Sequence, residues 1–360
     1  MIDSDSIESL RGIGLVPAVL QQAQTLPLQP EGSTLMRITE VQREGLTLHD
    51  GVNEHPARQL PALRWDLAAR ADALAVGDWV LATQNGFDEW WVHTRLQPTN
   101  QLARRLHDGR DKVTRVVIVS NVDTALLVMG LDADFSLRRL ERSVALVRMA
   151  GVAAVVVLTK KDLCADPGER LLQVLSQLPP DTPVVALNAL GSEPAQALAP
   201  WLQAGQTLVL MGSSGAGKST LTNALSNTAD QLTGANRADD ARGRHTTTAR
   251  SLHRTHGGAC IIDTPGLRTL RLDGDAGQLD AAFEDISQLA TQCRFRDCRH
   301  EAEPGCAVRA GVSADRLRNY GKLQREARRD TQTALERKAE VQQWKARGRD
   351  SRIRADAKRR

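Results

Sequence analysis

The sequence lacks long apolar runs: nowhere in its 360 residues does one approach the roughly 18 residues that a membrane-spanning helix needs. The opening residues, MIDSDSIESL, are acidic and lack the basic segment that precedes the apolar core of a secretory signal. On both absences we expect a cytoplasmic protein with no membrane partner. The length allows two or three domains and at least one large buried core.

Cysteine is also scarce, since five residues are too few for a disulfide framework. Cys164 and Cys260 stand alone and are predicted to be buried thiols. The other three crowd together with a histidine, and three thiolates with one imidazole are the donors of a closed structural zinc site. Unrelated buried thiols are the alternative, but this short loop buries too little apolar surface to fold without a metal. The predicted ligands are Cys293, Cys298, His300 and Cys306.

Charge is unevenly divided, although the whole chain carries a net charge of only +4. Residues 316–360 hold 16 Lys and Arg against 6 Asp and Glu, a net of +10, so the rest of the chain carries −6. A basic segment on an acidic body is typical of contact with nucleic acid, and a solvated helix is the alternative.

The patterns of apolar and polar residues along the chain predict a multidomain protein that begins with a peripheral extension over residues 1–33. Short alternating segments such as TLMRITEV, GDWVLAT and EWWVHTRL predict a small β-barrel over 34–105. Apolar runs between helical patterns, among them TALLVMG, AAVVVLT and TLVLMG, predict an α/β domain with a parallel sheet over 106–275. A helical domain with the cysteine cluster follows over 276–347. The basic tail over 348–360 has too few apolar residues to pack and is predicted to be disordered.

A phosphate-binding loop is predicted by MGSSGAGKST, which satisfies G-x-x-x-x-G-K-[ST] between an apolar strand and a helical segment. Its glycines let backbone N–H groups turn around phosphate oxygens at the start of the helix. Lys218 would supply a cation to the β- and γ-phosphates, and Ser219 would bind Mg²⁺. The alternative, a Gly- and Ser-rich linker turn, does not account for the flanking strand and helix. The predicted phosphate-binding residues are Gly212, Ser213, Ser214, Gly215, Ala216, Gly217, Lys218, Ser219 and Thr220.

The segment DTPG follows the apolar strand ACII, 45 residues beyond Lys218. Asp263 is predicted to reach a magnesium-bound water, and Gly266 to let the backbone approach the γ-phosphate. Alone, DTPG is a common turn, but its position after the phosphate loop favours the metal-side role.

Base selection is predicted from TKKD, directly after the strand AAVVVL. The Asp162 carboxylate would accept N1–H and N2–H₂ of guanine, whereas adenine would leave that charge unpaired at about 1 to 3 kcal/mol. The Lys160 stem would cover the purine, and Thr159 would fix the loop. A second segment, ALNAL, would present backbone N–H groups to guanine O6. A solvated turn is the alternative reading of so short a motif. The predicted base-binding residues are Thr159, Lys160, Lys161, Asp162 and Asn188.

The order of these motifs is reversed, because most GTP-binding proteins place the phosphate loop first and the base-reading segment last. An open parallel sheet gathers its loops at the carboxyl ends of the strands, so the chain can be cut and rejoined without losing the site. The order therefore predicts a circular permutation.

With TKKD, GSSGAGKST, RHTTT, DTPG and CRFRDCRHEAEPGC in this order, the sequence resembles the circularly permuted GTPases that depend on the small ribosomal subunit. NVDTALLVM and DFSLRRLERSV are similar too, and the resemblance covers about residues 34–347. It implies an OB-type barrel, a permuted P-loop GTPase domain and a C-terminal helical zinc-binding subdomain that act in late subunit maturation. We expect a monomer that takes GTP or GDP, Mg²⁺ and one structural Zn²⁺. The predicted barrel is acidic, since residues 35–97 hold 6 Arg against 9 Asp and Glu. This charge balance does not support RNA contact over the whole barrel surface, so such contact would need a local basic patch.

The usual water-positioning glutamine of small GTPases is missing, because Leu267 follows DTPG. By similarity to the family, Thr247 in GRHTTT is predicted to sense Mg²⁺ and the γ-phosphate, so the magnesium contacts would be Ser219, Thr247 and Asp263. His245 would orient or deprotonate water, and a solvated loop histidine is the alternative. The predicted catalytic residues are Lys218, His245 and Thr247.

The sequence thus predicts a GTP hydrolase that binds the small ribosomal subunit and its rRNA and is stimulated by the subunit. A P-loop ATPase or kinase is one alternative. A nucleotide-gated rRNA-binding factor with incidental hydrolysis is the other.

Overall fold

The computed structural model describes residues 4–26, 30–42, 44–107, 113–226, 250–264 and 276–331. The chain divides into two compact units, one drawn from residues 1–104 and 115–271 and the other from 105–114 and 272–360. None of the helices in the described ranges combines the length and apolar character that crossing a bilayer requires.

The first unit begins with two helices, α1 (Ser4–Arg11) and α2 (Pro17–Thr25). The prediction that this segment is peripheral is wrong, because Leu10 and Ile13 are almost fully buried. Gly14 has φ +90°, and a Cβ there would lie 2.0 Å from the guanidinium of Arg37. Only glycine combines that backbone conformation with that space.

Five strands then close a barrel, in the order β1-β2-β3-β5-β4 with β4 returning to β1. A register shift between Ile38 and Glu40 lets β1 pair with β4 through its first half and with β2 through its second. Alternate side chains fill the interior, and Leu67 of a short helix packs against them. The elements are β1 (Thr34–Val41), β2 (Leu46–His49), β3 (Glu54–Gln59), α3 (Pro61–Ala69), β4 (Trp79–Gln84) and β5 (Trp90–Arg95).

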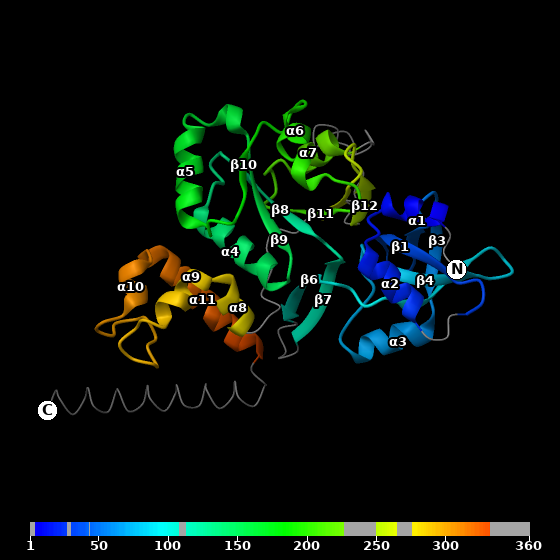
Figure 1. Ribbon diagram of the computed structural model, residues 1–360, viewed down its shortest axis with the longest axis horizontal. Helices are drawn as coiled ribbons and strands as arrows, with labels where there is room; N and C mark the ends of the chain where they lie inside the picture. Colours follow the sequence, from blue (N-terminus) through cyan, green and yellow to red (C-terminus); the bar gives the residue numbers. More distant parts are fainter. Residues whose placement is uncertain are drawn as a thin grey trace, which may run out of the picture. The chain divides into compact units, whose positions relative to one another are not determined.

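A two-stranded sheet of β6 (Gln101–His107) and β7 (Val113–Ser120) follows, and then the α/β domain. Its strands stand in the order β10-β9-β8-β11-β13-β12, all parallel except β12, with helices on both faces (Figure 1). The apolar runs in the sequence are the buried strands of this sheet. The elements are β8 (Thr124–Gly130), α4 (Leu137–Met149), β9 (Ala153–Thr159), η1 (Lys161–Leu163), α5 (Pro167–Gln177), β10 (Val184–Ala186), α6 (Glu193–Ala197), η2 (Ala199–Trp201), β11 (Thr207–Met211), α7 (Lys218–Leu225), β12 (Ser251–Arg254) and β13 (Cys260–Asp263).

The barrel and the α/β sheet are joined by an antiparallel pairing of β1 with β12 at Glu40 and Ser251. Beside this pairing, the fully buried guanidinium of Arg37 donates to the carbonyls of Ile13 at 2.5 Å and Asn121 at 3.2 Å. It also lies 5.3 Å from the ring centroid of Trp79. One side chain thereby ties the N-terminal segment, the barrel and the start of the α/β domain.

The second unit is helical, and its core forms around Phe283. The ring of Tyr320 packs edge-on against it with the centroids 5.2 Å apart, and the Tyr320 hydroxyl donates a hydrogen bond to the Asp280 carboxylate at 2.7 Å. Arg316 makes a two-bonded ion pair with Asp285 and lies over the same ring at 5.1 Å. The helices are α8 (Ala276–Ala282), α9 (Glu284–Ala290), α10 (Ala307–Gly311) and α11 (Ala314–Thr331).

A buried carboxyl gives the first unit a testable pH dependence. Asp78 is fully buried, and burial raises the pKa of its carboxyl from 3.8 to about 6, despite Arg95 at 3.9 Å. The folded chain therefore holds this proton more tightly than the unfolded chain. The resulting stabilisation is present at low pH and is lost as pH rises to about 6.

We expect the free energy of unfolding of the wild type to fall relative to Asp78→Asn by on the order of 2–3 kcal/mol between about pH 4 and pH 7. Urea unfolding followed by tryptophan fluorescence measures the difference. Asp88→Asn, in an exposed loop, is the matched control because it leaves the buried carboxyl in place. Parallel stability profiles for wild type and Asp78→Asn would contradict the expectation.

Candidate functional site

The phosphate-loop motif lies between β11 and α7, the strand and helix that the sequence predicted. Gly212 sits against β8, where a Cβ would lie 2.2 Å from the Val128 carbonyl oxygen. The Lys218 ammonium donates to the carbonyls of Gly212 at 2.9 Å and Ser213 at 2.8 Å, so it is held across the loop. Ser219 and Thr220 lie in the first turn of α7, where free backbone N–H groups favour an anion.

Thr159 joins the TKKD segment, which was predicted to read the base, to this loop. It ends β9 with no exposed surface, and its hydroxyl donates a 2.6 Å hydrogen bond to the carbonyl of Ala216. The two residues lie 57 positions apart along the chain. TKKD and the phosphate loop therefore meet at the carboxyl edge of the sheet.

The three residues after Thr159 form a tight turn. Lys160 takes a left-handed conformation with φ +58°, and Lys161–Leu163 form the 3₁₀ turn η1. The Asp162 carboxylate is exposed, and within the described ranges no hydrogen bond or ion pair engages it. Both of its oxygens are open to a ligand.

An acidic loop after β8 contacts both motifs, and the sequence reasoning missed it. Asp132 pairs with the Lys160 ammonium at 2.5 Å, and this bond is the main reason that the pKa of the Asp132 carboxyl is lowered. Asp134 accepts from the Ser213 hydroxyl in the phosphate loop and pairs with Arg139. The signal in the sequence was DAD one residue beyond the end of a parallel strand, in a place where loops converge.

Asn188 follows β10, beside the base-reading turn. Its backbone N–H donates to Glu193 at 3.0 Å, and its side-chain oxygen accepts from the N–H of Leu190 at 2.9 Å. Asp263 ends β13, the neighbour of β11, and is 7% exposed. Next to it the buried Thr264 hydroxyl donates to the Leu210 carbonyl at 2.8 Å, which holds the end of β13 against the phosphate-loop strand.

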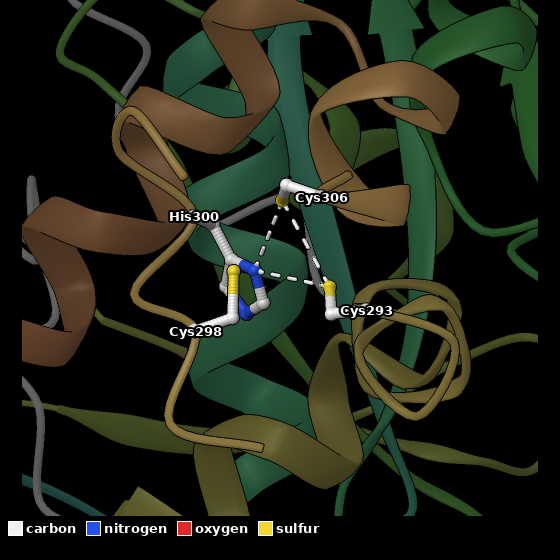
Figure 2. Close-up of side chains that lie close together, drawn as sticks. All are labelled: Cys293, Cys298, His300 and Cys306. Atoms are coloured by element: carbon white, nitrogen blue, oxygen red, sulfur yellow. Dashed lines mark hydrogen bonds between the residues drawn. The ribbon is translucent and has the colours of Figure 1, made fainter. Parts of the chain in front are cut away.

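The four predicted metal ligands lie together in the second unit (Figure 2). Their donor atoms are all within 4.8 Å of one another. The Cys293 sulfur lies 3.8 Å from that of Cys306, and His300 Nδ1 lies 3.4 Å from the latter. A tetrahedron with Zn–S of about 2.3 Å requires S···S of about 3.8 Å, so the spacing and the donors fit zinc. Of the remaining thiols, Cys260 is buried as predicted and Cys164 is only half-buried.

Comparison with known proteins identifies the fold and the family. The model of the RsgA GTPase family matches residues 96–273. A small ribosomal subunit biogenesis GTPase RsgA from Xylella fastidiosa is 44% identical over 297 residues, which is 81% of this chain and 84% of that one. The protein of the same name from Xanthomonas axonopodis is 43% identical over 81% of this chain and 80% of its own.

This chain belongs to the RsgA GTPase family. Solved structures agree on the fold: YjeQ from Thermotoga maritima matches with a TM-score of 0.59 and 22% identity over 82% of this chain and 98% of its own. YloQ, described as a circularly permuted GTPase, matches with 0.58 and 23% over 85% and 99%. The predicted family, the permuted fold and the GTPase activity are confirmed. RsgA-family membership leaves no support for the ATPase or kinase alternative.

Several predicted residues of this RsgA-family GTPase lie outside the described residues: His245, Thr247, Gly266 and the basic tail over 348–360. Their roles stay predictions from the sequence.

The Thr159 bond gives a direct test. Thr159→Val keeps the shape but leaves the Ala216 carbonyl without its donor, at a cost of about 1–3 kcal/mol in stability. Because that bond sets the spacing of the two loops, we also expect weaker GDP binding by titration calorimetry. The control is Thr124→Val, which changes a buried threonine at the amino end of β8, away from the loops at the carboxyl edge of the sheet. Unchanged GDP affinity in Thr159→Val would refute the link.

Proposed function

We propose that this GTPase binds the small ribosomal subunit during late assembly, that its nucleotide state controls docking, and that the subunit stimulates hydrolysis. The relatives named above are small ribosomal subunit biogenesis GTPases and span most of this chain. The contact between Thr159 and Ala216 supports the nucleotide part of the proposal, because it joins TKKD to the phosphate-loop motif.

In the proposed complex, the phosphates lie against the backbone N–H groups of residues 212–217 and the Lys218 ammonium. Asp162 accepts from N1–H and N2–H₂ of guanine, Lys160 lies along the purine, and the backbone after Asn188 faces O6. Ser219, Asp263 and Thr247 would hold Mg²⁺, which supplies charge neutralisation at the phosphates. His245 would position the attacking water.

The acidic barrel and the basic segment suggest different contacts on the subunit. We assign rRNA contact to residues 316–360, whose net charge is +10. Arg316 is an exception, because it is 8% exposed and paired with Asp285, so it supports the fold of the second unit.

The main test is steady-state GTP turnover with and without isolated small subunits. We expect turnover to rise at least about tenfold with subunits, as other GTPases gain from a partner that completes the site. Asp162→Asn should lose turnover of GTP and recover it with xanthosine triphosphate, whose 2-oxo group accepts from the new amide. Equal wild-type rates with and without subunits would reject the coupling.

We also infer one structural zinc ion at the cysteine cluster. The purified chain should contain about one zinc, and Cys306→Ser should remove it and lower the melting temperature of the second unit. Elemental analysis and calorimetry measure both effects. Cys164→Ser, outside the cluster, is the matched control. A Cys306→Ser chain that kept its zinc and its melting temperature would disprove the assignment.

A further inference from the structure

Glu193 links the two segments that flank the proposed guanine site. It is the first residue of α6, and its two carboxylate oxygens have different partners. One oxygen accepts the backbone N–H of Asn188 at 3.0 Å. The other makes an ion pair with the Lys161 ammonium. The bond from Lys161 is the main reason that the pKa of the Glu193 carboxyl is lowered, so this group is anionic at neutral pH.

The partners of Glu193 come from separate strands. Lys161 follows β9 and immediately precedes Asp162, whereas Asn188 follows β10. The side chain of Asn188 in turn accepts from the N–H of Leu190, so the second segment is closed into a small turn. The pairing of β9 with β10 ends at Leu158 and Leu187, and a single carboxylate bridges the two loops beyond that point.

Stability alone does not explain this arrangement. Lys161 and Glu193 side chains are 39% and 38% exposed, and ion pairs at such exposure contribute little to folding. The same carboxylate nevertheless accepts a charge-assisted bond from a backbone N–H, which fixes direction as well as distance. Such bonds are typical of groups that hold a binding site in shape.

We propose that Glu193 is a positioning residue for guanine recognition, which sets the distance between the Asp162 carboxylate and the backbone that follows Asn188. The inference rests on the proposed function, in which these two segments hold opposite edges of the base. Both partners of Glu193 belong to the loops on the base side of the proposed site. Its loss should raise the Kd for guanine nucleotides and the KM for GTP, with kcat changed far less.

The experiment measures Kd for GDP and ADP by titration calorimetry, using full-length chain. Glu193→Gln keeps an acceptor for the Asn188 N–H but loses the ion pair, so we expect about threefold weaker GDP binding. Glu193→Ala loses both bonds and should weaken GDP binding about tenfold. ADP binding should stay as weak as in the wild type. Glu169→Gln, an exposed glutamate on α5, is the matched control.

A double-mutant cycle with Lys161→Met tests whether Glu193 acts through its ion pair with Lys161. If the two residues act through their ion pair, Lys161→Met and Glu193→Gln together should weaken GDP binding about as much as either alone. Additive losses, or GDP affinity unchanged in Glu193→Ala, would overturn the inference. The Asp162→Asn variant distinguishes failure of this inference from failure of the proposed function. If Asp162→Asn binds xanthosine diphosphate while Glu193→Ala keeps its GDP affinity, only the role of Glu193 fails. If Asp162→Asn gains no affinity for xanthosine diphosphate, base reading by Asp162 fails, and the inference about Glu193 fails with it.

Discussion

The hydrogen bond from the Thr159 hydroxyl to the Ala216 carbonyl is the contact on which the proposed nucleotide site depends. It is buried, and it joins the end of β9 to the loop between β11 and α7. A buried bond of this kind is costly to break, since its carbonyl has no water to replace the donor. Around it the exposed polar groups are arranged in pairs, with Asp132 on Lys160, Asp134 on Ser213 and Glu193 on Lys161.

The reversed order of motifs has a simple physical basis. Strands β9, β8 and β11 are neighbours and parallel, so their carboxyl ends lie at one edge whatever their order in the chain. In this permuted chain, β12 pairs antiparallel with β13 on one side and with β1 of the barrel on the other. The site and the barrel consequently belong to one continuous sheet, with the buried Arg37 beside the junction.

Features encoded by local patterns could be predicted from the sequence. The phosphate loop, TKKD and the cysteine cluster each combine a short spacing with a required residue type, and the apolar runs marked the buried strands. Contacts between distant residues could not be predicted in this way. Asp132 and Glu193 are ordinary surface carboxylates in the sequence, and their partners are 28 and 32 residues away. The burial of Leu10 and Ile13 was missed for the same reason, because the neighbours of this segment, among them Arg37, Gly51 and Arg254, lie far along the chain.

We infer that one guanine nucleotide contacts both TKKD, the earlier motif in the chain, and the phosphate-loop motif, the later one. A crystal structure with bound GDP tests it most directly. We expect both Asp162 oxygens at about 2.7–3.2 Å from N1 and N2 of guanine, with the diphosphate against residues 212–220. A diphosphate in that loop with the base turned away from Asp162 would contradict it.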